Sequence, residues 1–132
     1  MSRWKSLEAL LRAIDAASAP SFPPPVTVNS RRSDDDTPLH IVATWGDVEA
    51  IEMLARAGAD VDAVGDLDST PLYTAVHAGH AAAARTLLEA GASPYRRDKF
   101  GRTATELAMR SGNPELVALF SGMSPEPGKD HP

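Results

Sequence analysis

The chain has 132 residues, of which 42% are hydrophobic but only 5% aromatic, so a core must be built mainly from Ala, Leu, Val and Ile. The formal net charge of −5 argues against non-specific binding to nucleic acid or to anionic membranes. The chain has no cysteine, which excludes disulfides and cysteine-based zinc sites, and no stretch approaches the roughly 20 apolar residues of a membrane span.

The first predicted element is a helix over residues 2–17. Its apolar residues recur at helical spacing and fall on one face: they are Trp4, Leu7, Leu11 and Ile14. A helix this short is unstable by itself in water, so we expect residues 1–19 to form an N-terminal capping helix that lies on the rest of the chain. The prolines that follow predict an extended, Pro-rich linker over residues 20–33.

A repeat with a period of 33 residues follows the linker. The segment Thr37-Pro38-Leu39-His40 returns as Thr70-Pro71-Leu72-Tyr73, and returns in a weaker form as Thr103-Ala104-Thr105-Glu106. The same step separates three glycines, which are Gly46, Gly79 and Gly112. Several independent positions that obey one period indicate a stack of repeated units.

Each repeat predicts two short helices. A threonine suits the N-cap position and a proline suits the first helical position, while in the third repeat Thr103 and Glu106 form a capping box. The first helices are expected at 38–45, 71–78 and 104–111, where a glycine ends each of them, and the second helices at 48–57, 81–90 and 114–121. The segments between the repeats are rich in turn-forming residues.

A 33-residue period that begins with Thr-Pro-Leu-His resembles the ankyrin repeat. The resemblance implies an all-α solenoid of helix-turn-helix repeats with β-turn or hairpin fingers, to which the N-terminal capping helix is added. The repeats are expected within residues 34–122, at 34–66, 67–99 and 100–122. Residues 123–132 are polar and rich in proline, and we expect them to be a disordered C-terminal tail.

The resemblance also implies a function, because ankyrin repeats bind other proteins through fingertips and the exposed face of the first helices. We therefore expect a non-catalytic interaction module without cofactor or metal, monomeric when free and cytoplasmic, that binds neither nucleic acid nor membrane. Carried over by alignment, the partner-binding residues are Asp34, Asp36, Thr44 and Trp45 in the first repeat, Asp66, Leu67, Ser69 and His77 in the second, and Lys99, Phe100, Arg102 and Arg110 in the third.

Among these residues Trp45 is expected to be an interface anchor, because it falls at the exposed end of a first helix between acidic segments. The alternative is that the N-terminal helix or the linker covers it. Residues 34–68 carry a net charge of −9 and residues 85–110 a net charge of +3. An acidic end would suit a basic enzyme or toxin, so inhibition or stabilisation of such a partner, as by a bacterial immunity protein, is one hypothesis.

Two other classes of function stay open at this point. A scaffold could self-associate through the apolar face of the N-terminal helix. A metal-dependent hydrolase could use Asp34–Asp36, His40 or His77, and His77 and His80 have the spacing of a metal-binding pair. The family resemblance instead implies a structural, hydrogen-bonding role for His40, and no nucleophile or phosphate-loop motif supports an enzyme.

Overall fold

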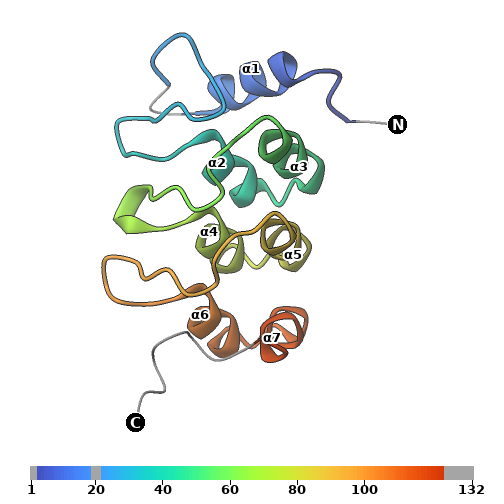
Figure 1. Ribbon diagram of the computed structural model, residues 1–132, viewed down its shortest axis with the longest axis vertical. Helices are drawn as coiled ribbons and strands as arrows, with labels where there is room; N and C mark the ends of the chain where they lie inside the picture. The colour runs from blue at the N-terminus through green and yellow to red at the C-terminus, as the bar shows by residue number, and fades with distance from the viewer. Residues whose placement is uncertain (1–2, 19–21, 124–132) are drawn as a thin grey trace.

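The computed structural model describes residues 3–18 and 22–123, which form a column of stacked helix pairs (Figure 1). The helices in chain order are α1 (Leu7–Ala17), α2 (Pro38–Trp45), α3 (Val48–Arg56), α4 (Pro71–His77), α5 (Ala81–Glu89), α6 (Ala104–Arg110) and α7 (Pro114–Ser121). A short 3-10 turn, η1 (Asp66–Asp68), lies between α3 and α4. No strand occurs in the described residues, so the expected all-α solenoid is confirmed; the tail expected at 123–132 lies outside them apart from Met123.

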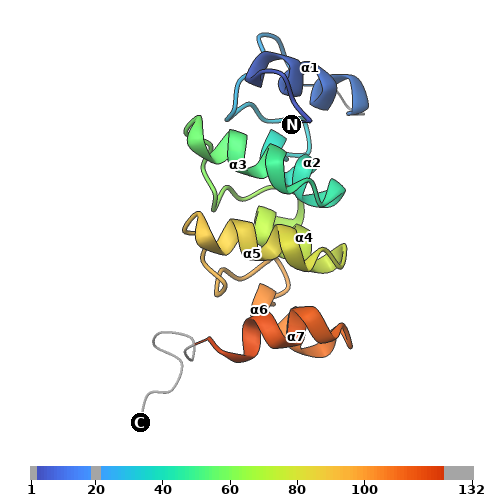
Figure 2. The ribbon, with the colours of Figure 1, turned by 90° about the vertical axis from the view of Figure 1, so that its right-hand side faces the viewer.

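The helices form two rows. Helices α2, α4 and α6 pack on one another in one row, α3, α5 and α7 form the second, and Figure 2 views the stack from the side of the second row. Three loops project on the side of the first row (Figure 1). We name them the first finger (residues 31–36), the second finger (residues 64–69) and the third finger (residues 97–102). None of the helices in the described ranges combines the length and the apolar character needed to cross a lipid bilayer.

The helix starts follow from local capping chemistry, as the sequence predicts. Thr70 Oγ1 accepts the amide of Tyr73 at 3.2 Å, and Thr103 Oγ1 accepts the amide of Glu106 at 3.1 Å. The Glu106 carboxylate in turn accepts the amide of Thr103 at 3.0 Å, which completes the predicted capping box. Gly46 ends α2 in the left-handed conformation, at φ +73°.

Helix α1 differs from the sequence prediction in its start and in its buried face. It begins at Leu7 rather than at residue 2, because Ser6 caps it: Ser6 Oγ accepts the amide of Ala9 at 3.1 Å. The fully buried residues are Leu10 and Ile14, whereas Leu7 is only partly buried. The spacing rule missed Leu10 because the face of α1 that meets α2 and α3 is rotated from the predicted stripe.

The residues before α1 bind the first repeat. Trp4 Nε1 and Arg3 Nη1 both donate to Asp47 Oδ2, at 2.9 Å and 3.0 Å. Asp47 also caps α3, since its Oδ1 accepts the amide of Ala50 at 3.0 Å. This anchoring places the apolar face of α1 against the chain's own first repeat, which leaves less apolar surface for the alternative of self-association through that face.

The segment predicted as a linker packs against the first repeat. Phe22 is buried at 4% exposure, and Asn29 Oδ1 accepts the amide of Asp60 at 2.9 Å. The same bond recurs 33 residues later, where Asp62 Oδ1 accepts the amide of Ser93 at 2.9 Å. The linker therefore contacts the first repeat through a bond that also joins later units.

The third repeat departs from the others at Thr105, which occupies the position of the buried Leu39 and Leu72. Its hydroxyl would be costly to bury without a partner. In the structure Thr105 is only partly buried and Thr105 Oγ1 donates to the carbonyl oxygen of Pro94 at 3.0 Å. The substitution is thus accommodated by one hydrogen bond between α6 and the segment before it.

Candidate functional site

The three fingers share one turn geometry. A backbone amide donates to a carbonyl four residues later at 2.8–2.9 Å in each finger, and the pairs are Arg32–Asp36, Gly65–Ser69 and Asp98–Arg102. The second-last residue of each turn has a left-handed backbone conformation, and the φ angles are 73° at Asp35, 60° at Asp68 and 78° at Gly101. Aspartate and glycine are suited to this conformation. The repeat therefore positions three fingertips at equal intervals along the stack.

The third finger is built around Asp98, whose side chain is 1% exposed. Its Oδ1 accepts the amides of Phe100 and Arg102, both at 2.9 Å, and its Oδ2 accepts Arg102 Nε at 3.0 Å. Burial by itself raises the pKa of Asp98, but the hydrogen bonds from Arg102, Phe100 and Tyr73 outweigh it and hold the pKa below the usual 3.8. Asp98 therefore stays ionised and shapes the fingertip.

Arg102 is held above two aromatic rings. Its guanidinium carbon lies 5.0 Å from the ring centre of Phe100 and 5.8 Å from that of Tyr73, distances typical of cation–π contacts. Phe100 itself is 63% exposed. The amide of Lys99 donates to the carbonyl oxygen of Leu67 at 2.9 Å, so the tips of the second and third fingers are joined.

Two adjoining cavities lie between these fingers and the first row of helices, and together we name them the inner groove. The larger has a volume of about 250 Å³ and is lined by Leu67, Ser69, Tyr73, Thr74, His77, Arg102 and Leu107. The smaller has a volume of about 200 Å³ and is lined by Gly101, Arg102, Glu106, Leu107 and Arg110. The inner groove is therefore part apolar and part cationic.

The inner groove brings together many of the partner-binding residues that the sequence predicts. Those that line it are Leu67, Ser69, His77, Arg102 and Arg110, and two more, Lys99 and Phe100, belong to the exposed third fingertip. The other predicted residues neither line it nor belong to the third fingertip, and they are Asp34, Asp36, Thr44, Trp45 and Asp66. The structure thus concentrates the expected surface at the second and third repeats.

Sequence reasoning missed Thr74 and Leu107, although a signal for them was present. They precede His77 and Arg110 by three residues, and residues three apart on a helix share a face. It also missed Tyr73, because that residue occupies the position of His40 in the repeat and was interpreted as structural.

The expectation of an exposed Trp45 is wrong. Trp45 is partly buried and packs against the hydrophobic core, although it is the last residue of α2. Ala78 and Ser111, at the equivalent positions, are exposed. Core packing gives the indole a structural reason to occupy this position, so its proposed role as a freely presented anchor loses its basis.

The acidic residues of the first finger are engaged within the chain. Arg32, whose side chain is 12% exposed, pairs with Asp34 Oδ2 at 2.7 Å and with Asp36 Oδ2 at 3.3 Å. Asp36 Oδ1 also accepts the amide of Asp66 at 2.9 Å. Partial burial raises the pKa of Asp34, but hydrogen bonds from Arg32 and from backbone amides outweigh it and lower the pKa. These carboxylates stabilise the finger and its junction with the second finger.

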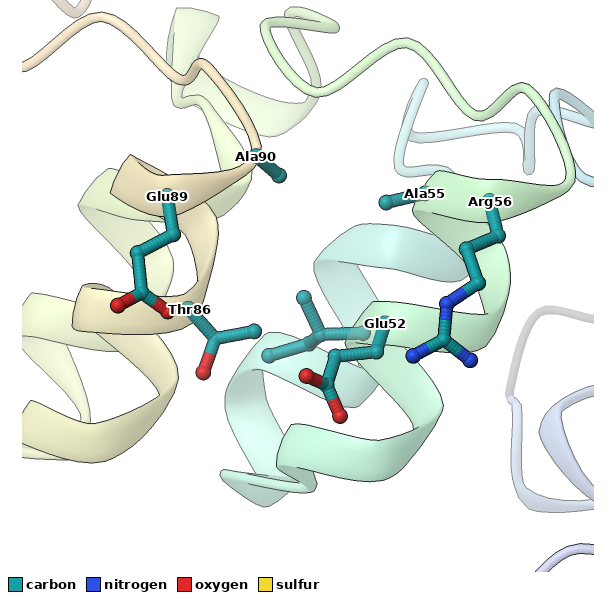
Figure 3. A pocket seen from close by; sticks show the side chains of 7 residues that line it. Glu52, Ala55, Arg56, Thr86, Glu89 and Ala90 are labelled. Atoms are coloured by element: carbon teal, nitrogen blue, oxygen red, sulfur yellow. The ribbon is translucent and has the colours of Figure 1, made fainter.

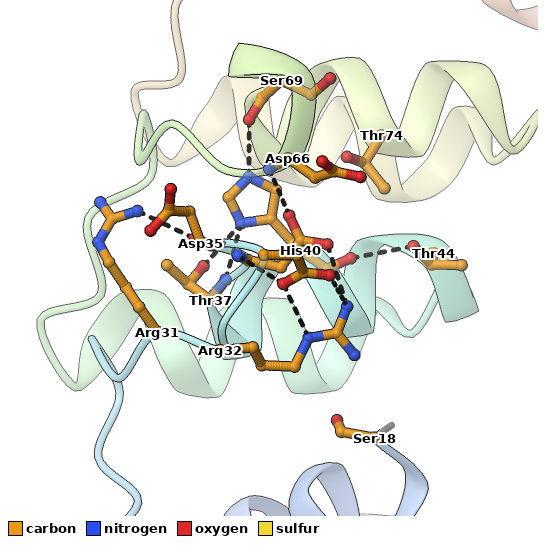
Figure 4. A network of polar contacts seen from close by, with 12 residues as sticks. Ser18, Arg31, Arg32, Asp35, Thr37, His40, Thr44, Asp66, Ser69 and Thr74 are labelled. Carbon is orange, nitrogen blue, oxygen red and sulfur yellow. Dashed lines mark hydrogen bonds and ion pairs between the residues drawn. The ribbon is translucent and has the colours of Figure 1, made fainter. Parts of the chain in front are cut away.

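His40 joins the first two repeats through both ring nitrogens (Figure 4). The carbonyl oxygen of Ser69 lies 2.8 Å from Nε2 and can only accept, so Nε2 carries the proton. Nδ1 then accepts from the amide of Thr37 at 3.1 Å and from its hydroxyl at 2.9 Å. The structural interpretation of His40 is confirmed, and a neutral imidazole satisfies the site.

The free energy of unfolding is expected to fall as the pH is lowered below about 6.5, because burial lowers the pKa of His40 from its ordinary 6.5. Below that pH the unfolded chain binds the proton more readily than the folded chain does, so stability rises with pH in this window. Urea unfolding at pH 7.5 and 5.5 measures the effect, and the non-titrating His40→Gln variant should show a flatter dependence. Equal dependence in both proteins would contradict this origin.

The alternative of a metal-dependent enzyme gains no support from the geometry. No three His, Asp or Glu side chains in the described ranges are grouped so as to hold a metal ion. His80 Nε2 donates to the carbonyl oxygen of Thr44 at 3.0 Å, so this nitrogen is not available as a metal ligand.

A further groove of about 340 Å³ lies on the opposite row of helices, between α3 and α5 (Figure 3). Glu52 and Glu89 stand on its two sides, and small side chains such as Ala55, Thr86 and Ala90 line the space between them. It contains none of the predicted partner-binding residues, and it is more open than the inner groove.

The comparison with known proteins agrees with this architecture. A family model described as ankyrin repeats, in three copies, matches residues 7–98 and 62–127. The chain is 37% identical over 97 residues to the human B-cell lymphoma 3 protein, which covers 70% of this chain and 21% of that protein. It is 37% identical over 87 residues to a Caenorhabditis elegans homologue of transient receptor potential cation channel subfamily A member 1, covering 65% of this chain and 7% of that protein. It is 34% identical over 116 residues to human SH3 and multiple ankyrin repeat domains protein 2, covering 86% of this chain and 6% of that protein. The chain thus spans less than a quarter of each of these relatives.

Proposed function

The chain belongs to the ankyrin-repeat family, and from that premise we propose that it is a non-catalytic module whose inner groove holds a segment of one partner protein. Ankyrin repeats are protein-protein interaction units in general, and the partner and its pathway are specific to each chain. A stack of repeats presents a preorganised surface, so little conformational entropy is lost on binding.

The observation that carries this proposal is the exposure of large apolar side chains beside the inner groove. Phe100 is 63% exposed and Leu67 is 49% exposed, and both are at fingertips that the Lys99 amide joins. Exposed aromatic and aliphatic side chains that border a recess are typical of interface hot spots. The arginine stacked on Phe100 adds a second residue type that is enriched at such sites.

Leu67 supports the proposal through its backbone. Its φ of 56° lies in the left-handed region, which is unfavourable for leucine by roughly 1 kcal/mol or more. A glycine or asparagine would relieve this strain, yet the chain presents a leucine in the second fingertip. Strain of this kind at an exposed position favours a role in binding over a role in folding.

A basic toxin or enzyme as the partner, inhibited in the manner of an immunity protein, would need available carboxylates at the first finger. Asp34 and Asp36 are instead paired with Arg32, and Asp36 also caps the amide of Asp66. The charge of that end can still steer an encounter at long range, and Asp35 is exposed, but Asp34 and Asp36 are already engaged within the chain.

The test of the proposed function is the loss of a partner when Phe100 is truncated. Tagged wild-type protein captures partners from a lysate of the source cells, and Phe100→Ala is expected to bind the captured protein at least about 30-fold more weakly, equivalent to about 2 kcal/mol. Met109→Ala is the matched control, because Met109 is 47% exposed but lines neither cavity of the inner groove. Equal affinity of wild type and Phe100→Ala for the captured protein would contradict the site.

A further inference from the structure

We propose that the partner segment in the inner groove is an acidic stretch of polypeptide that carries one apolar anchor side chain. This inference rests on the proposed function and adds the chemistry of the segment. It follows from the charge, the rigidity and the size of the inner groove, and from the charge at the opposite end of the stack.

The charged side chains that the inner groove presents to solvent are mainly cationic. Arg102 and Arg110 line it and are exposed, and Lys99 is exposed at the adjoining fingertip. The one carboxylate in the lining, Glu106, accepts the amide of Thr103 at 3.0 Å and is 3.7 Å from Arg97. Asp98 is buried beneath the fingertip. Exposed cations are therefore concentrated at the third finger and at Arg110, whereas exposed carboxylates stand at the second fingertip, at Asp66 and Asp68.

Arg102 is suited to hold a carboxylate. Its Nε and Nη2 bond Asp98 Oδ2 at 3.0 Å and 2.9 Å, and these bonds and the rings of Phe100 and Tyr73 keep the guanidinium in one place. Half of the side chain stays exposed, at 52%, and the Nη1 hydrogens are left for a partner carboxylate. Immobilising a free arginine on binding costs conformational entropy, and this arginine is already ordered. A guanidinium also matches the geometry of a carboxylate better than an ammonium does.

The apolar part of the inner groove accommodates one side chain. Leu67, Tyr73 and Leu107 line the larger cavity, whose volume is about 250 Å³. A protein cavity of about 150 Å³ lined by apolar residues is known to accept a benzene ring, so one leucine or phenylalanine side chain fits by size. Burial of a leucine side chain there stabilises the complex, and the flanking charges orient the bound segment.

The rest of the stack limits where an acidic segment binds. Residues 34–68, which include Asp66 and Asp68 of the second finger, carry a net charge of −9, and this charge repels further carboxylates from the first repeat and from the second fingertip. The acidic part of the partner is therefore confined to the end of the inner groove nearest the third repeat. This polarity gives the bound segment a defined position along the stack.

Titration of the 15N-labelled full chain with three blocked pentapeptides tests the inference. The probes are Asp-Glu-Leu-Asp-Glu, its charge-reversed counterpart Lys-Arg-Leu-Lys-Arg, and Asp-Glu-Ser-Asp-Glu, which lacks the anchor. At low salt the first probe is expected to shift the amides of Leu67, Thr74 and Leu107 saturably, and at least about tenfold more tightly than the second. The serine probe should bind several-fold more weakly than the first. Absence of saturable shifts at these amides with the first probe, or equal binding of the charge-reversed probe there, overturns the inference.

Charge-reversal variants locate the contact. Arg110→Glu is expected to weaken binding of the first probe about tenfold. Arg85→Glu is the matched control, because Arg85 is exposed on α5, outside the inner groove, and changes the net charge equally. If both variants bind the first probe equally weakly, the loss of affinity comes from the change in net charge alone, and the inference is overturned. If Phe100→Ala loses a captured partner but the acidic probe fails to bind, the inference falls while the proposed function stands.

Discussion

Gly65→Ala is expected to lower the free energy of unfolding by about 2–4 kcal/mol. A Cβ atom at this position would lie 2.7 Å from His40 Nε2 and against Asp36 Oδ1. His40 would have to move away from the Ser69 carbonyl, and a buried hydrogen bond between the first two repeats would be lost. The φ of Gly65 is −112°, which other residues adopt without difficulty, so the close contact is the cause.

Chemical denaturation of wild type, Gly65→Ala and Gly122→Ala measures this effect. Gly122 is the matched control, because its φ is −84° and a Cβ there would meet nothing within 4 Å. Its replacement is expected to change the free energy of unfolding by less than about 0.5 kcal/mol. If both variants unfold at the wild-type midpoint, the His40 network does not hold the first two repeats together as described.

Asp98→Asn is expected to lower the free energy of unfolding by about 2–3 kcal/mol. Both carboxylate oxygens accept hydrogen bonds, Oδ1 from the amides of Phe100 and Arg102 and Oδ2 from the Arg102 guanidinium. An asparagine turns one of these atoms into an NH₂ donor that faces other donors in a buried site. The third fingertip should loosen, and binding through Phe100 should weaken with it.

Asp68→Asn is the control for this prediction. Asp68 belongs to the second finger and is exposed, and its φ of 60° suits asparagine as well as aspartate. Denaturant unfolding should separate Asp98→Asn from wild type and leave Asp68→Asn within about 0.5 kcal/mol of it. The lowered pKa of Asp98 adds a pH signature: the stability that the carboxylate contributes is present above pH 3.8 and is lost as the pH falls through the lowered value. Matching stabilities for the two variants would contradict the role of Asp98.

Helix positions were predictable from the sequence where the signals are local. A threonine caps a helix through its own side chain and the amide three residues later, so Thr70 and Thr103 mark α4 and α6 without reference to the rest of the molecule. The period of 33 residues then placed the remaining helices by repetition. The same regularity placed the fingertips, including the exposed Leu67 and Phe100.

Predictions of burial and of side-chain partners were less successful, because these depend on which residues the fold packs against a side chain. Periodicity put Leu7 and Leu11 on the buried face of α1, but the orientation of the helix on α2 and α3 buries Leu10 fully instead. Trp45 was expected to be exposed, but it packs against the core. Asp34 and Asp36 were expected to bind a partner, but in the structure both pair with Arg32.

The sequence by itself therefore determined the repeat, the helix limits set by capping, and the protein-binding class of the family, because these depend on residues close in the chain or on its period. Only the tertiary structure decided which of the exposed residues act together. The inner groove joins Leu67 and Tyr73 of the second repeat to Leu107 of the third, and the carboxylate of the buried Asp98 holds Arg102 where it stacks on Phe100. Such arrangements follow from packing between repeats, which residue patterns and spacings along the chain do not predict.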